Sequence, residues 1–382
     1  MKDKLLLLMT PNMSLEKWHE LGQLSRELNY YTALCRSSGL KLLIFSYGRD
    51  DEKYLKGHSG MEVLCIPGWI SRKIPFRVQN LLYHVWALMF FREQFGRVVL
   101  SKTNQYSSSG FGLILKAIFG IPLVVRMGYY YSHFLGLGFV QRIKERIAFR
   151  LCDLIIVTSN EASAFIKKNY GISHEKILSM YNAIDLELFK PSGRQKEYDF
   201  IFIGRFEKQK NIGLLMQVLC GLNMKSLIIG KGSLSHVVQE ALSRTQSMEW
   251  KESVDNSELP FYYNKARCVI LLSEYEGSPK VLLEAMACGT PGIGTSVPGT
   301  RECIDHGVNG ILVGNREADI RRDILSWFSD LNQLETMGHK ASGWVRHHCD
   351  MTKNINREIE FYGILPLFRS FTMQINQKVP SC

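Results

Sequence analysis

A short apolar run, a polar loop and a helical segment follow each other directly in the second half of the chain, and this succession constrains the fold most. The run Cys268–Leu272 has the length and composition of a buried strand. Pro279 suits the first turn of a helix, where its missing N–H matters least. Residues 281–287 are apolar enough for a helix that is packed on two sides. Gly289 is a typical C-cap, and Pro291 prevents continuation of the helix.

Two of the acidic residues in this segment are Glu276, in the loop, and Glu284, about two turns further along the helix. The helix N-terminus presents free N–H groups and a partial positive charge, which together suit a phosphate. A loop carboxylate and a helix carboxylate can then reach polar groups on either side of that phosphate. An isolated pair of this spacing usually means only a loop acid and a solvated helix acid. Here the surrounding residues make the pattern far more specific: Gly277, Pro279, Gly289 and Pro291.

At these residues the chain resembles the nucleotide-sugar-dependent retaining glycosyltransferases of family 4, whose donor site carries the pattern E-G-x-P-x-x-x-x-E-A-x-A-x-G-x-P. The segments Val297–Glu302 and His306–Val313 also match that family. The resemblance covers roughly residues 150–315 well and the first 150 residues loosely. It implies an α/β protein of GT-B architecture, with two Rossmann-like doubly wound domains facing across a cleft. It also implies a hexosyltransferase of EC 2.4 type, as found in lipopolysaccharide or exopolysaccharide biosynthesis.

A second candidate element is the strand Tyr198–Ile203 followed by a glycine turn, basic residues and a helix from about Ile212. This is a phosphate-binding arrangement. By resemblance, Arg205 and Lys210 neutralise the donor pyrophosphate, Glu276 contacts the sugar ring and Glu284 holds the ribose hydroxyls. The catalytic candidates are therefore Glu276, Arg205 and Lys210. The full donor-binding set is Arg205, Lys210, Gly230, Glu276, Gly277, Ser278, Pro279, Lys280, Val281 and Glu284.

The first half departs from the family pattern in two places. Many members have a glycine-rich first loop, but no glycine precedes Gly22 here, and the histidine expected near Gly128 is absent. The acceptor-side candidates are Asn12, Arg126, Tyr129 and His133. These departures leave two alternatives open: a nucleotide-sugar epimerase of GT-B-like fold, and a catalytically silent relative that only binds a nucleotide sugar.

The segment Lys176–Pro191 resembles the family's crossover between domains, N-x-x-D-x-x-x-F-x-P. Its Asn182 and Asp185 are turn formers, so we interpret them as structural first and as cleft-lining second. We expect an acceptor-binding domain over 1–190 and a nucleotide-sugar-binding domain over 191–360. The segment 361–382 is expected to pack back on the first domain, as the last helix commonly does in this fold.

Charge is distributed unevenly along the chain. Residues 1–190 hold 25 Lys and Arg against 15 Asp and Glu, whereas residues 191–382 hold 22 against 21. A basic half favours an anionic partner, and because no nucleic-acid-binding motif occurs we expect a membrane surface or a lipid pyrophosphate. The helical segment Arg77–Phe95 is apolar nearly all round, which fits either core burial or partial insertion into a bilayer. The expected basic contact residues are Arg72, Lys73, Arg77, Arg92 and Arg97, and the residues expected to insert are Trp86, Phe90 and Phe91. A solvated basic face without a partner is the simpler alternative.

Metal and cofactor motifs are absent from the sequence. It contains no Asp-x-Asp and no C-x-x-C pair, and its nine cysteines suit reduced core thiols. We therefore expect no metal and no cofactor beyond the nucleotide sugar, preferably a UDP-sugar, as co-substrate. No apolar run approaches the ~18–20 residues of a membrane span. The expected location is the cytoplasm, peripheral to the inner face of the cell membrane.

Overall fold

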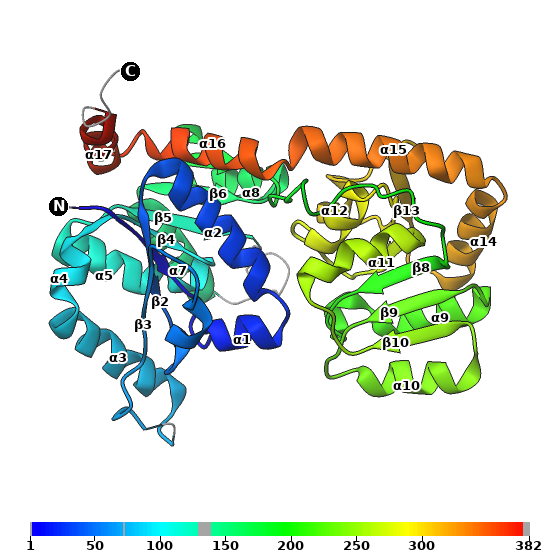
Figure 1. The fold of residues 1–382 in the computed structure, drawn as a ribbon, viewed down its shortest axis with the longest axis horizontal. Coiled ribbons are helices and arrows are strands. Elements are labelled where there is room, and N and C mark those ends of the chain that lie inside the picture. The colour runs from blue at the N-terminus through cyan, green and yellow to red at the C-terminus, as the bar shows by residue number, and fades with distance from the viewer. Residues whose placement is uncertain (1, 72, 129–138, 377–382) are drawn as a thin grey trace. The chain divides into compact units, whose positions relative to one another are not determined.

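A computed structural model describes residues 2–71, 73–128 and 139–376, and the chain divides into two compact units (Figure 1). Unit 1 comprises residues 1–157, 162–179 and 352–382. Unit 2 comprises residues 158–161 and 180–351. The borders at 179/180 and 351/352 fall somewhat earlier in the chain than the expected 190/191 and 360/361.

Unit 1 is built on a parallel sheet of seven strands in the order β3-β2-β1-β4-β5-β6-β7. The strands are β1 (Lys4–Leu8), β2 (Lys41–Phe45), β3 (Met61–Leu64), β4 (Val98–Thr103), β5 (Leu123–Met127), β6 (Leu154–Val157) and β7 (Ile177–Ser179). The strand order reverses between β1 and β4, which confirms the doubly wound fold expected for this half. All five residues of β1 are buried, so the apolar start of the chain is an interior strand, as predicted.

Helices cover both faces of this sheet. The connections from β1 to β3 carry α1 (Leu15–Glu20), α2 (Leu24–Ser38) and η1 (Asp51–Leu55). The connections from β3 to β7 run in the opposite direction and carry α3 (Phe76–Phe90), α4 (Arg92–Gly96), η2 (Tyr106–Ser108), α5 (Ser109–Phe119), α7 (Phe139–Leu151), α8 (Asn160–Tyr170) and η3 (His174–Lys176). Because parallel crossovers are right-handed, the two sets lie on opposite faces.

Two helices predicted as continuous are interrupted in the structure. The sequence predicts one helix that Ser14 caps and that runs to about Leu34. In the structure Ser14 does cap α1, by accepting a hydrogen bond from Lys17 N, but the helix ends at Glu20. Gly22 then adopts a left-handed conformation with φ of 64°, which ends one helix before the next begins. The predicted helix Arg77–Phe95 is likewise divided into α3 and α4, which meet at Phe91.

The last helices, α16 (Met351–Tyr362) and α17 (Pro366–Asn376), return to unit 1 from residue 352 onward. The sequence predicts a single helix around Ile355–Phe371 here, whereas the structure has two. The return is anchored by an ion pair between Lys102 on β4 and Glu358 on α16, both without exposed side-chain surface. The hydroxyls of Tyr30 and Tyr362 donate to the same carboxylate, and the Lys102 ammonium lies over the Tyr30 ring.

Unit 2 has a parallel sheet of six strands in the order β10-β9-β8-β11-β12-β13. These are β8 (Tyr198–Ile203), β9 (Ser226–Ile229), β10 (Met248–Lys251), β11 (Ala266–Leu271), β12 (Gly292–Thr295) and β13 (Gly310–Val313). Its helices are η4 (Lys208–Lys210), α9 (Ile212–Leu222), α10 (Ser235–Arg244), η5 (Asn256–Glu258), α11 (Leu259–Lys265), α12 (Lys280–Ala287), α13 (Pro298–Arg301), α14 (Glu317–Phe328) and α15 (Leu331–His348). The order reverses between β8 and β11.

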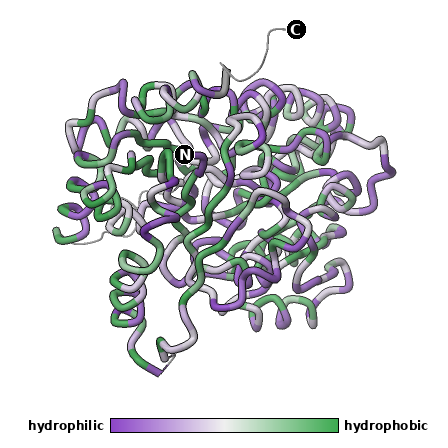
Figure 2. Tube along the Cα trace, turned by 60° about the vertical axis from the view of Figure 1, so that its left-hand side comes forward, coloured by the Kyte–Doolittle hydropathy of each residue, from purple (hydrophilic) through white to green (hydrophobic). Residues whose placement is uncertain are grey.

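The strands of both sheets are mainly hydrophobic, whereas many outer turns carry hydrophilic residues (Figure 2). A doubly wound sheet binds its ligands outside the carboxyl ends of the strands, where the strand order reverses. In unit 2 that point lies beyond β8 and β11. The two segments that the sequence singled out, the one with Arg205 and Lys210 and the one with Glu276, begin there.

Candidate active site

The loop 273–279 joins β11 to α12. Residues at the carboxyl ends of the neighbouring strands hold it in place by hydrogen bonds. Thr295 Oγ1, at the end of β12, donates to Ser273 O at 2.6 Å. Gln209, which lies beyond β8, accepts a bond from Glu274 N at 2.9 Å and donates from its side chain to Tyr275 O at 3.1 Å. The carboxyl ends of three strands therefore fix the backbone of the loop that carries Glu276.

Gly299 on α13 and Asn182 also contact this loop and fix its position. Gly299 N donates to Glu276 O at 3.2 Å, and a Cβ at residue 299 would lie 2.5 Å from Gly277 O. Residue 299 therefore has to be glycine for the loop to keep its position. Asn182 Nδ2 donates to Ser278 O at 2.8 Å, in agreement with the structural role predicted for it. Asp185 accepts from Glu187 N and caps its own turn, also as predicted.

An ion pair between Lys210 and Glu276 lies at the centre of the site. Lys210 Nζ is 2.5 Å from Glu276 Oε1, and Ser273 Oγ donates to the same oxygen at 2.6 Å. The two side chains are only 13% and 6% exposed, so water screens their interaction weakly. The structure thus brings two of the three predicted catalytic residues into direct contact.

Arg205, the third, is exposed, and its guanidinium forms no hydrogen bond or ion pair with the part of the chain that the structure describes. It is close enough to influence Glu207. Hydrogen bonds from Ser233 chiefly lower the pKa of the Glu207 carboxyl, and the charge of Arg205 lowers it further. The Arg205 guanidinium is therefore free to engage an anion from solution. The neighbouring Lys208 is also exposed.

The N-terminus of α12 faces the same loop. None of the described side chains caps this helix, whose N-cap residue is Pro279. Ser278 Oγ is buried and has no hydrogen-bond partner among the described residues. A buried hydroxyl without a partner, next to an uncapped helix N-terminus, is a donor arrangement for an anionic oxygen. Beyond the loop, Gly289 takes the left-handed C-cap conformation that the sequence predicted, with φ of 76°.

Glu284 lies inside unit 2 with no exposed surface. Its oxygens accept hydrogen bonds from Asn256 Nδ2 and Tyr263 OH, each at 3.2 Å. The pattern of the sequence identified this acid but not its two partners, which come from η5 and α11. A contact of Glu284 with ribose hydroxyls stays a prediction.

Gly230 follows β9 and has φ of 151°. A Cβ there would lie 1.9 Å from Gly204 O, so the two turns after β8 and β9 are packed backbone against backbone. Trp250 Nε1 also donates to Gly230 O at 2.8 Å. These contacts explain why residue 230 is glycine, and its part in donor binding stays a prediction.

A cavity of about 480 Å³ adjoins the pair on the side of β12 and β13. Its lining is mostly polar and uncharged, with amide and hydroxyl side chains and one carboxylate. The lining residues are Asn211, Ser273, Glu274, Thr295, Ser296, Val297, Val313, Gly314 and Asn315. No group of three or more His, Cys, Asp and Glu side chains suited to a metal ion occurs among the described residues.

Two of the four acceptor-side candidates can be placed, both at the carboxyl edge of the sheet of unit 1. Asn12, after β1, adopts φ of 72°, and Lys17 Nζ donates to its carbonyl at 2.6 Å. Asparagine tolerates this left-handed conformation, so it supplies a turn without the glycine of the resembled family. Arg126, the fourth residue of β5, is half-buried and donates from Nη1 to Asn104 O at 3.4 Å. Tyr129 and His133 lie outside the described residues.

Two family models match most of the chain between them. The model described as Glycosyltransferase Family 4 matches residues 30–188, and the one described as Glycosyl transferases group 1 matches residues 184–344. Among solved structures, a protein of Anabaena crystallised in complex with UDP and glucose superimposes with a TM-score of 0.73 at 18% identity. That match covers 94% of this chain and 98% of the Anabaena chain, and shows the same fold.

Two curated proteins illustrate the range of relatives. The D-inositol 3-phosphate glycosyltransferase of Paenarthrobacter aurescens (strain TC1) is 26% identical over 360 residues, which cover 81% of this chain and 86% of that protein. An N-acetylgalactosamine-N,N'-diacetylbacillosaminyl-diphospho-undecaprenol 4-alpha-N-acetylgalactosaminyltransferase of Campylobacter jejuni is 30% identical over 174 residues. Those residues cover 42% of this chain and 46% of the Campylobacter protein.

Proposed function

Since the chain belongs to glycosyltransferase family 4 (group 1) and is a retaining enzyme that uses a nucleotide sugar, we propose that it transfers a hexosyl residue from a UDP-sugar to a lipid-linked saccharide in cell-surface glycan synthesis. The observation that carries this proposal is the buried Lys210–Glu276 pair beside the uncapped N-terminus of α12. UDP is favoured because the Anabaena protein was crystallised with it.

Transfer breaks the bond between the anomeric carbon and the pyrophosphate, so negative charge grows on the leaving phosphate. Lys210 and Arg205 supply positive charge, and the α12 N-terminus with Ser278 Oγ supplies hydrogen-bond donors. Glu276 holds the Lys210 ammonium in place and lies where it can meet the sugar ring. The acceptor hydroxyl then attacks from the side of the leaving group, with the phosphate as its base, which retains the anomeric configuration.

A lipid-linked acceptor is favoured by the basic first half and by the name of the Campylobacter relative, which acts on a diphospho-undecaprenol. The structure also exposes apolar side chains on α3, among them Leu81, Met89 and Phe90 at 62%, 59% and 63%. Lys73, Arg77 and Arg92 are exposed near its ends. We therefore place the enzyme at the inner face of the cell membrane, attached peripherally. None of the described helices is long and apolar enough to cross a membrane.

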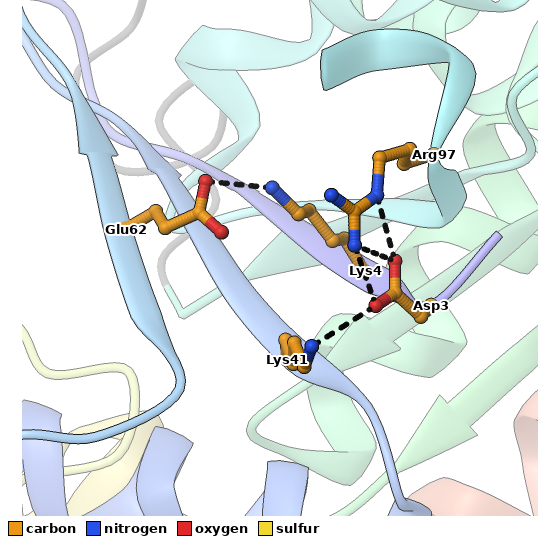
Figure 3. A network of polar contacts seen from close by, with 5 residues as sticks. All are labelled: Asp3, Lys4, Lys41, Glu62 and Arg97. Atoms are coloured by element: carbon orange, nitrogen blue, oxygen red, sulfur yellow. Dashed lines mark hydrogen bonds and ion pairs between the residues drawn. The ribbon is translucent and has the colours of Figure 1, made fainter. Parts of the chain in front are cut away.

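The expected contact surface on α3 differs in part from the one that the sequence suggested. Arg97 is bonded to Asp3 at 2.8 Å in a network at the amino edge of the sheet, together with Lys41, so its charge is already matched (Figure 3). Trp86 is only partly exposed and stacks on Phe90. Arg72 lies outside the described residues.

We expect activity to persist in EDTA. The fixed positive charges of Arg205 and Lys210 and the N-terminus of α12 take the role that a divalent ion has in metal-dependent transferases. Initial rates with a UDP-sugar and lipid extract as acceptor, before and after chelation, measure this. A loss of activity that Mg²⁺ or Mn²⁺ restores would contradict the proposal.

We also expect substantial turnover of the UDP-sugar only when an acceptor is present. This separates the two alternatives from the transferase, since an epimerase converts the donor without an acceptor and a silent relative does not convert it at all. Release of UDP, with donor epimers resolved by chromatography, is the measurement. Donor epimerisation, or no UDP release with any lipid extract, would favour the alternatives.

A further inference from the structure

Helix α7 carries a row of apolar side chains that stay exposed next to the described residues of its unit. Phe139 and Val140 are 78% and 65% exposed, and Ile143, Ile147 and Leu151 follow at helical spacing with 40%, 47% and 55% exposed. The opposite side of the helix is buried through Glu145, Ala148 and Phe149. Because helical residues three and four apart share a face, residues 140, 143, 147 and 151 form one stripe that points away from the sheet.

Basic residues border this stripe on both sides. At 100° per residue, Lys144 lies on one edge, and Arg142, Arg146 and Arg150 lie on the other. All four side chains are exposed, and none forms an ion pair with the described part of the chain. The acid of the helix, Glu145, is buried and accepts a bond from Tyr170 OH at 2.5 Å. The outward surface of α7 therefore combines apolar and cationic side chains and has no negative charge.

We infer that α7 lies on an anionic lipid surface, with its apolar stripe at the level of the acyl chains and its four cations among the headgroup phosphates. An amphipathic helix with an exposed apolar stripe between Lys and Arg residues is the arrangement that binds bilayer interfaces. This inference rests on the proposed function, and it identifies the element that carries the membrane contact.

The stripe continues onto neighbouring helices. α7 contacts α5, α5 contacts α4, and α4 contacts α3, all on the same face of the sheet of unit 1. Ile114 and Ile118 of α5 are 42% and 56% exposed between the stripe of α7 and the apolar side of α3. Because three neighbouring helices expose apolar residues, this face can bind a broad surface such as a bilayer. The Lys and Arg side chains of α7 that lack ion pairs favour a negatively charged surface.

Vesicle flotation tests the inference, with the full chain and phosphatidylglycerol-containing vesicles at low salt. Ile143→Ser/Ile147→Ser and Arg146→Gln/Arg150→Gln are each expected to lower vesicle binding by about tenfold or more. The matched controls replace exposed residues of unit 2 by the same residue types. These variants, Leu325→Ser and Arg316→Gln/Arg322→Gln, should bind vesicles as the unaltered chain does. Pure phosphatidylcholine vesicles should bind every form weakly.

Two further readouts separate the possible failures. UDP release with a short water-soluble acceptor should be the same in the unaltered chain and in the α7 variants. No release by the unaltered chain would count against the proposed function and not against the docking surface. Unchanged flotation of both α7 variants would overturn the inference. Size-exclusion chromatography that shows a dimer converted to a monomer, with vesicle binding retained, would assign the surface to a second copy of this chain and would also overturn it.

Discussion

Replacing Lys210 by alanine is expected to lower glycosyl transfer by about 10²-fold or more. The substitution removes the buried positive charge that opposes the negative charge developing on the leaving phosphate, and it leaves Glu276 without its partner at 2.5 Å. Arg205→Ala should have an effect of similar size, because its exposed guanidinium is available to the pyrophosphate. Initial rates at saturating and limiting UDP-sugar measure both effects.

Lys208→Ala is the matched control for the two variants, since Lys208 lies in the same turn and is exposed. It should retain near-normal rates. Lys210→Met removes the charge and keeps most of the side-chain volume, so it should lose activity as the alanine variant does. Normal turnover in Lys210→Ala and Arg205→Ala would refute the assignment of these residues to the phosphates.

The second large effect is expected on stability. Lys102→Ala should destabilise unit 1 by about 3–5 kcal/mol, because it leaves the fully buried Glu358 carboxylate without its opposite charge. Lys102→Met/Glu358→Gln should recover most of this loss, since the amide oxygen can accept from one tyrosine hydroxyl and the amide NH2 can donate to the other. Urea unfolding followed by circular dichroism measures the difference. A single variant as stable as the unaltered chain would show that the pair does not anchor α16.

The same pair predicts a loss of stability in acid. Burial alone raises the pKa of the Glu358 carboxyl, but Lys102 and the tyrosine hydroxyls outweigh burial and hold the pKa below its ordinary value of 4.5. A carboxyl whose folded-state pKa is depressed contributes stability above its unfolded pKa and loses that contribution as pH falls through the folded value. The stability difference between the unaltered chain and the double variant should therefore shrink below about pH 4.5.

The elements that the sequence predicts best are those whose local signals and tertiary environment agree. The sequence predicts strands over 154–157 and 198–203 and helices over 139–151 and 259–265, because apolar runs there are bordered by polar residues or turn formers. The structure has β6, β8, α7 and α11 with these bounds. Helix α5 was not predicted, since its sequence includes Gly110 and Gly112 and has weak intrinsic helix preference. The structure supplies the reason for one of them: a Cβ on Gly112 would lie 2.6 Å from Leu123 Cδ1, so close packing on β5 decides this helix.

In the candidate site, the sequence identifies the residues that carry charge and misses those that hold them. Glu276 and Lys210 follow from the motifs, yet their contact joins segments 66 residues apart, which no local pattern indicates. Gln209 and Thr295 are ordinary polar residues, and only the alignment of strand ends makes them supports of the loop. Asn12 is a different case. Where the resembled family has a glycine turn, this chain makes the turn with an asparagine, which tolerates the left-handed backbone conformation well.

The contact between Gly230 and Gly204 has a consequence for engineering. Because the main chains after β8 and β9 touch without intervening side chains, neither turn can shift without displacing the other. The turn after β9, which contains Lys231, and the turn after β8, which contains Arg205, are therefore expected to move together. A library that randomises residues 230–233 to change nucleotide preference will also alter the position of Arg205, so preference and catalytic rate are expected to change together in its variants.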